Sequence, residues 1–108
     1  RLMFIEMTSQ ALAGYLIVSG LLVAIGIIGF LSRRNLIVMF LCTELMFQGA
    51  ALAFIAAGRY LFDYSGQVMV IFILTVAAAE AALALALVVL LHRQGDSLEA
   101  DAYGELQE

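Results

Sequence analysis

The sequence predicts an all-α membrane protein in which three transmembrane helices run up, down and up in an antiparallel arrangement. Of its 108 residues, 65% are hydrophobic and only 13% are charged, whereas about 25% of the residues in a soluble domain are charged. The charged residues are also clustered, and they leave three long apolar runs between them. A single segment inside lipid must satisfy its own backbone hydrogen bonds, and a helix is the structure that does so.

The same composition excludes several classes of protein. The formal net charge of −4 argues against a nucleic-acid partner, because phosphate binding needs clustered lysine and arginine. One cysteine cannot form a disulfide within the chain, and one cysteine with one histidine cannot complete a zinc site. The sequence also has no glycine-rich nucleotide loop and no haem-attachment or iron–sulfur motif. We therefore expect this chain to bind no metal and no cofactor of its own.

The first predicted helix covers residues 11–31. This run has no ionisable residue and is apolar apart from Tyr15 and Ser19. It matches the length of about 20 residues that spans the hydrocarbon core and exceeds the apolar part of a signal peptide, which is about 7–15 residues long. The run is rich in glycine, and Gly20, Gly26 and Gly29 suggest tight helix packing.

Two further helices are predicted over residues 36–58 and 68–91. Glu44 interrupts the first of these apolar runs, and Glu80 interrupts the second. The connecting segments are short, so consecutive helices are expected to be antiparallel neighbours. Residues 92–108 form a polar, acidic tail, and residues 1–108 together are predicted to be one membrane domain.

The distribution of arginine predicts the orientation of the helices. Arg33, Arg34 and Arg93 lie on one side of the predicted membrane domain, and Arg1 and Arg59 lie on the other. Because the side richer in basic residues is usually cytoplasmic, the first loop and the C-terminal tail are expected in the cytoplasm and the N-terminus outside.

Glu44 and Glu80 are the candidate functional residues, because an acid at the centre of a spanning helix costs about 2.5–3.5 kcal/mol on insertion. Counted from the cytoplasmic ends of their helices, Glu44 is about 12 Å deep and Glu80 about 16 Å deep. Both are therefore expected near mid-membrane on adjacent helices. Glu80 lies within the alanine-rich segment 77–82, and small residues let membrane helices approach closely.

The chemistry indicated by these two acids is proton transfer. A carboxyl group shielded from water can bind and release a proton near neutral pH. Gln48 lies four residues after Glu44, on the same helix face, and is a candidate polar partner for it. The alternative interpretation is that both acids are structural and hydrogen-bonded between helices. Phe40 is interpreted as a core or lipid contact.

Four short motifs follow one another in a characteristic order: Arg33-Arg34-Asn35, Glu44-Leu45-Met46, Gly66-Gln67-Val68 and Ala77-Ala78-Ala79-Glu80-Ala81. Each motif alone is weak, but their order and spacing resemble the 4L-type family. Its bacterial members are subunit K of proton-translocating NADH-quinone oxidoreductase, or respiratory complex I. The resemblance extends over residues 33–93, and the first helix matches by hydrophobicity alone.

The resemblance implies a place in the membrane arm of a large complex. In that family the subunit lies between the quinone-proximal subunits, of the A, J and H types, and the first antiporter-like subunit, of the N type. The expected partners are therefore the J-type and N-type subunits, with the A-type subunit as a further candidate, and the lipid of a bacterial inner membrane. No homo-oligomer is expected. FMN, iron–sulfur clusters and quinone are expected in other subunits of the complex.

For the site residues, the resemblance implies that Glu44 and Glu80 belong to the chain of charged groups that couples quinone reduction to proton translocation. Glu44 corresponds to the more critical position. Arg33, Arg34 and Asn35 correspond to a cytoplasmic loop whose basic residues matter for coupling.

Three other interpretations remain open. The C-type subunit of multi-subunit cation/proton antiporters shares the three-helix plan, as does the matching subunit of membrane-bound hydrogenases. Both often lack one of the two acids. The remaining interpretation is a structural assembly subunit in which both acids are inert.

Overall fold

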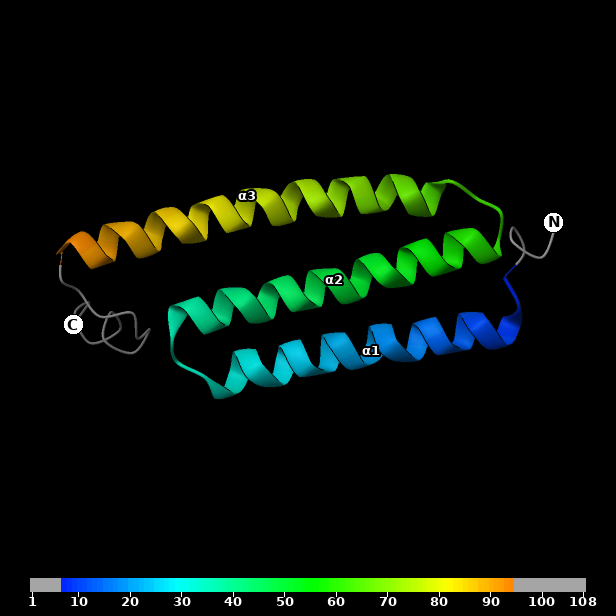
Figure 1. The fold of residues 1–108 in the computed structure, drawn as a ribbon, viewed down its shortest axis with the longest axis horizontal. Coiled ribbons are helices and arrows are strands. Elements are labelled where there is room, and N and C mark those ends of the chain that lie inside the picture. The colour runs from blue at the N-terminus through cyan, green and yellow to red at the C-terminus, as the bar shows by residue number, and fades with distance from the viewer. Residues whose placement is uncertain (1–6, 95–108) are drawn as a thin grey trace.

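Three long helices make up the described part of the chain (Figure 1). A computed structural model of the protein describes residues 7–94, in which α1 spans Ser9–Ser32, α2 spans Leu36–Tyr60 and α3 spans Ser65–Gln94. All three helices are long and apolar enough to cross a membrane, and consecutive helices run in opposite directions. The predicted up-down-up arrangement of three membrane helices is confirmed.

The helices extend beyond the predicted ranges, most clearly in α3. His92 and Arg93 were expected in the polar tail, but they lie in the last turn of α3. Positive charge at this end of a helix is favourable because the exposed carbonyl groups carry partial negative charge. The rest of the expected tail, 95–108, lies outside the described residues, as do residues 1–6.

The loop between α1 and α2 is short because both helix ends are capped next to it. The Arg33 N–H donates to the Gly29 carbonyl at 3.2 Å, which closes the last turn of α1. The Asn35 side-chain oxygen accepts a hydrogen bond from the Ile37 N–H at 2.9 Å, which caps the start of α2. Asparagine is among the preferred residues at this position.

The turn between α2 and α3 is a Schellman motif. The Asp63 N–H donates to the Gly58 carbonyl at 2.9 Å, and the Phe62 N–H donates to the Arg59 carbonyl at 3.3 Å. Phe62 has a φ of 54°, which is the left-handed conformation that glycine usually adopts in this motif. The Asp63 carboxylate then accepts a hydrogen bond from the N–H of Ser65, the first residue of α3, at 2.9 Å.

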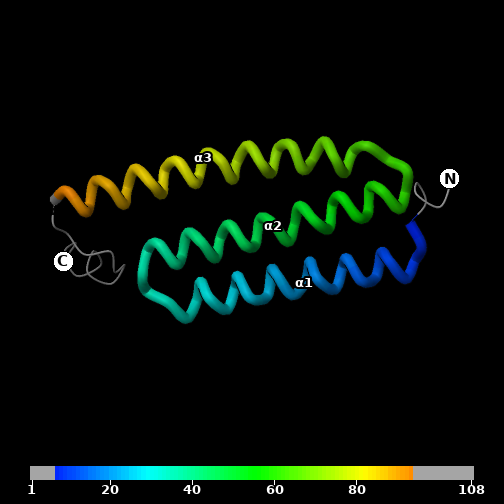
Figure 2. Tube along the Cα trace, viewed as in Figure 1, coloured from blue at the N-terminus to red at the C-terminus, as the bar shows by residue number. Residues whose placement is uncertain are grey.

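The central helix is α2, and the two outer helices make little contact with each other (Figure 2). α1 packs tightly against α2 because glycines line their interface. A Cβ atom added at Gly26 would lie 2.8 Å from the Cys42 carbonyl oxygen, and one added at Gly49 would lie 2.8 Å from the Ser19 carbonyl oxygen. The Ser19 hydroxyl also donates to the Gly49 carbonyl at 2.5 Å.

The glycines of α1 do not all share this face. Gly26 and Gly29 pack against α2, as expected, but a Cβ atom added at Gly20 would meet nothing within 4 Å. Gly20 therefore lies on the exposed side of α1 and makes no tight contact with the described residues. Long apolar side chains on that side are also exposed, among them Ile28 at 65%.

α2 and α3 approach each other closely beside their connecting turn. A Cβ atom added at Gly66 would lie 3.1 Å from the Gly58 Cα and would clash with the Phe54 carbonyl oxygen. Further along α3, Val70 and Ala77 are buried, and their spacing of seven residues places them on one face of the helix. Toward the opposite end, a cavity opens between the two helices.

Candidate functional site

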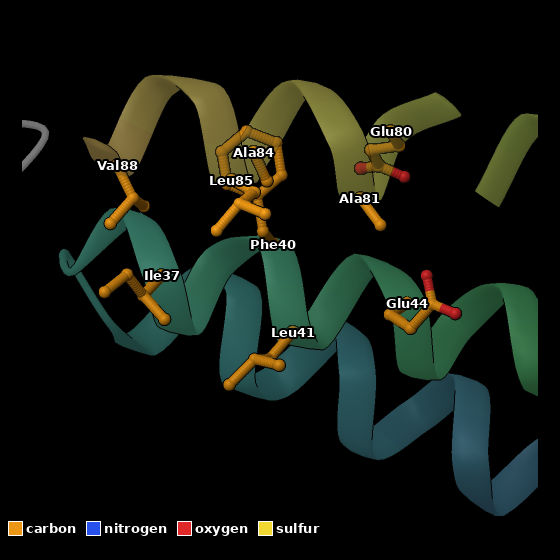
Figure 3. A pocket seen from close by; sticks show the side chains of 9 residues that line it. All are labelled: Ile37, Phe40, Leu41, Glu44, Glu80, Ala81, Ala84, Leu85 and Val88. Atoms are coloured by element: carbon orange, nitrogen blue, oxygen red, sulfur yellow. The ribbon is translucent and has the colours of Figure 1, made fainter. Parts of the chain in front are cut away.

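Glu44 on α2 and Glu80 on α3 line the same cavity, which has a volume of about 360 Å³ (Figure 3). Their carboxyl groups lie at one end of it, in the space between the two helices. Both side chains are half-buried. The two acids singled out from the sequence, 36 positions apart, are thus brought together by the fold.

The antiparallel packing of α2 and α3 explains why these residues meet. On α2, Phe40 and Ile37 precede Glu44 by about one and two turns, and residues three or four apart share a helix face. On α3, Ala84 and Val88 follow Glu80 by four and eight residues, which is again about one and two turns. The two rows lie opposite each other and form the cavity wall, which is apolar except for the two acids. Its members are Ile37, Phe40, Leu41, Glu44, Glu80, Ala81, Ala84, Leu85 and Val88.

The two carboxyl groups differ in their hydrogen-bond partners. Gln48 Nε2 donates to Glu44 Oε2 at 3.5 Å, which is long for a hydrogen bond. Glu80 Oε1 is buried and accepts no hydrogen bond from residues 7–94. A buried acceptor left without a donor costs about 1–3 kcal/mol. Glu44 therefore has a polar neighbour, whereas Glu80 has an oxygen that lacks a donor among the described residues.

The expected coupling loop lies outside this cavity. Arg33, Arg34 and Asn35 are exposed and line a separate cavity of about 530 Å³ together with Ser32 and Val38. The structure thus brings the three loop residues together at the end of α1 and α2, and it does not bring them to the two acids.

The apolar wall of the cavity is the part of the site that the sequence interpretation missed. The sequence predicts Phe40 to be a core or lipid contact, and the structure places it in the wall of the cavity with Ala84 and Leu85. The sequence shows that Phe40 is four residues from Glu44 and that Ala84 is four residues from Glu80. This spacing becomes informative only when α2 and α3 are known to pack with these faces together.

A second cluster of polar groups lies at the other end of α2 and α3. Arg59, Asp63 and Gln67 line a cavity of about 310 Å³ beside the turn, and Gln67 Oε1 is buried without a donor from the described residues. Hydrogen bonds from Ser65, first from its backbone N–H and then from its hydroxyl, hold the pKa of the exposed Asp63 carboxyl below its usual value.

The carboxyl cavity can bind protons, because its polar members are carboxyl groups. Within residues 7–94 no three histidine, cysteine, aspartate or glutamate side chains are grouped so that they could hold a metal ion. Two acids separated by an apolar space can hold one proton between them.

Comparison with known proteins identifies the family. A family model described as NADH-ubiquinone/plastoquinone oxidoreductase chain 4L matches residues 14–108. NADH-quinone oxidoreductase subunit K of Ralstonia pickettii is 47% identical over 102 residues, which cover 94% of this chain and 99% of the relative. Subunit K 2 of Geotalea uraniireducens is 47% identical over 91 residues, covering 84% and 91%, and subunit K of Persephonella marina is 46% identical over 93 residues, covering 86% and 93%. The chain is a multi-pass membrane protein that belongs to the chain 4L family of NADH-quinone oxidoreductase subunits.

Proposed function

We propose that Glu44 and Glu80 bind and exchange a proton as part of proton translocation by the NADH-quinone oxidoreductase that contains this subunit. The observation that supports the proposal is the shared apolar cavity, with both carboxyl groups at one end. Two charged carboxylates in such a space repel each other, and one shared proton removes that repulsion. Glu80 Oε1, which has no donor among residues 7–94, is an oxygen on which such a proton can bind.

A proton that moves between the two acids also moves charge between α2 and α3. Because the charge on one carboxyl group changes the proton affinity of the other, the pair can pass on either a proton or an electrostatic signal. Gln48 assists this exchange by donating a hydrogen bond to Glu44 from the exposed side.

In this proposal the redox chemistry belongs to other subunits, which hold FMN, the iron–sulfur clusters and quinone. The neighbours are the J-type and N-type subunits, with the A-type subunit as a further candidate, in a bacterial inner membrane. The loop with Arg33, Arg34 and Asn35 faces the cytoplasm and contributes to coupling. The relatives are K subunits of NADH-quinone oxidoreductase, which supports this assignment over an antiporter or hydrogenase subunit with the same three-helix plan.

The test is to replace Glu44 by glutamine, which keeps the shape and hydrogen-bonding capacity of the side chain but cannot ionise. Proton transfer by a positioned group contributes about 10²–10⁴-fold to a rate, so we expect proton pumping to fall by at least about tenfold. Pumping is measured in inverted membrane vesicles as NADH-driven acidification, beside the rate of NADH oxidation. Glu80→Gln should be milder but detectable, and the two changes should not be additive, because both act on one proton.

The matched control is Thr43→Val. Thr43 is adjacent to Glu44, but its hydroxyl is already used in a hydrogen bond to the Met39 carbonyl at 2.9 Å, so the change removes a polar group without removing a proton site. Native gels establish that each complex is assembled. Normal pumping in assembled Glu44→Gln would contradict the proposal and favour the structural interpretation of both acids.

A further inference from the structure

We propose that Phe40, together with Ala84 and Leu85 across the cavity, forms an apolar barrier between the carboxyl pair and the water at the arginine-bearing end of the helices. The inference rests on the proposed role of Glu44 and Glu80 as proton-binding groups and names the residues that control water access to them.

The cavity is layered along its length (Figure 3). Glu44, Glu80 and Ala81 lie at one end, and Ile37 and Val88 lie at the other. This second end leads to the arginine loop, because Ile37 lies one residue after the start of α2. The middle layer separates the two ends and consists of Phe40, Leu41, Ala84 and Leu85.

The side chains of the middle layer determine whether water fills this part of the cavity. The cavity has a volume of about 360 Å³, which is room for several waters, but water withdraws from the parts of a cavity whose walls are apolar. A hydrophobic constriction blocks ions and protons in the same way, because water withdraws from it. Every residue of the middle layer is apolar, so it interrupts any file of water that would run from the arginine end to the acids.

Phe40 has the largest side chain in this layer. It is half-buried, whereas Leu41 and Leu85 are 63% and 66% exposed and lie at the outer edge. The small side chain of Ala84, on the opposite helix, leaves room for the ring. Proton-binding groups that move charge in a cycle must be shielded from continuous contact with one bulk phase, and the Phe40 ring supplies that shield on this side.

The experiment measures water access directly, by cysteine labelling in membranes that contain the assembled complex. The reporter is Ala81→Cys, beside the acids, in a Cys42→Ser background, and the probe is a hydrophilic methanethiosulfonate reagent applied to each face of the membrane in turn. With Phe40 intact, the reporter should react slowly from the arginine-bearing side. With Phe40→Ser, which removes the ring and adds a hydroxyl that holds water, labelling from that side should be faster by about tenfold or more.

Two controls separate barrier opening from general disruption. Phe40→Leu keeps the layer apolar and should leave the labelling rate unchanged. Phe72→Ser makes the same chemical change on α3 at a side chain that is 62% exposed and lines none of the described cavities, so it should also leave the rate unchanged. If the complex with Phe40→Ser does not assemble, Leu85→Ser is used instead. It adds a hydroxyl to the same layer and should also accelerate labelling.

Equal labelling of the reporter with Phe40 intact and with Phe40→Ser would overturn the proposal, whether both rates are high or both are zero. An increase that also appears with Phe72→Ser would overturn it as well. Labelling of the reporter does not require proton pumping. A negative labelling result therefore contradicts the barrier alone, whereas normal pumping in Glu44→Gln contradicts the proposed proton role.

Discussion

Asp63 determines how α3 begins. Its carboxylate accepts hydrogen bonds from Ser65, at a helix end where backbone N–H groups have no partner within the helix. A negative charge is also favourable there because of the helix dipole. The pKa of Asp63 is therefore held below its usual value, and the ionised side chain stabilises the turn.

A prediction about pH follows from the direction of this shift. Because the pKa of Asp63 is lowered in the folded protein, its stabilisation is complete above the pKa of the unfolded chain and is lost as the pH falls through the lowered value. Protection of the Ser65 amide, measured by hydrogen–deuterium exchange and corrected for intrinsic rates, should thus be constant between about pH 5 and about pH 8. Asp63→Ala should reduce protection throughout this range, and Asp63→Asn, which keeps an acceptor, should reduce it less. A loss of protection on going above about pH 5 in the unaltered protein would contradict this assignment.

The predictability of single residues depends on whether their role is local. Glu44 and Glu80 could be identified as candidates because acids are rare in apolar segments. The role of Phe40 could not, because it depends on which face of α2 meets α3. Phe62 also could not be predicted, since helices usually place glycine or asparagine in the left-handed position after their last turn.

At the scale of helices, glycine distribution distinguishes the packed faces from the open ones. Gly26 and Gly49 let α1 and α2 approach to backbone contact, and Gly58 and Gly66 do the same for α2 and α3. The sequence predicted the helices because apolar runs of sufficient length are explicit in it. The helix ends were less predictable, because capping by Thr8 and Asp63 extends the helices into polar sequence.

A pair of glycine substitutions tests this distinction. A methyl group at Gly66 would meet the Phe54 carbonyl oxygen, and overpacking of this kind costs about 1–3 kcal/mol. Gly66→Ala should therefore lower the temperature at which the subunit dissociates from the complex on native gels. Gly20→Ala is the matched control, because a Cβ atom there meets nothing within 4 Å of the described residues and alanine favours a helix by about 0.5–1 kcal/mol over glycine. Equal effects of the two changes would show that the contact at Gly66 is unimportant.

At the scale of the whole molecule, α2 separates the two outer helices, and both of these expose broad apolar surfaces. Short connections predicted that consecutive helices are neighbours. Hydrophobicity alone could not predict that α1 and α3 stay apart, because lipid-facing and subunit-facing surfaces are both apolar. The exposed surfaces suit a subunit that is surrounded by other membrane chains.

The orientation of the whole molecule can be tested with two single cysteines at opposite ends of the helices (Figure 1). Ser32 lies at the arginine-bearing end, and Tyr64, which is 80% exposed, lies at the turn between α2 and α3. In a Cys42→Ser background, a membrane-impermeant thiol reagent should label Tyr64→Cys in intact cells and Ser32→Cys only in inverted vesicles, because the end richer in arginine stays in the cytoplasm. The reverse pattern would show that the orientation is inverted.

The glycine contact between α2 and α3 has a mechanical consequence. Gly66 and Glu80 are separated by about 21 Å along α3, at 1.5 Å per residue. If α3 pivots by about 5° at the glycines, Glu80 is displaced by about 2 Å, which is the difference between a hydrogen bond and none. With such a pivot at the tight turn, a force on the outer face of α3 would change the separation of the two acids.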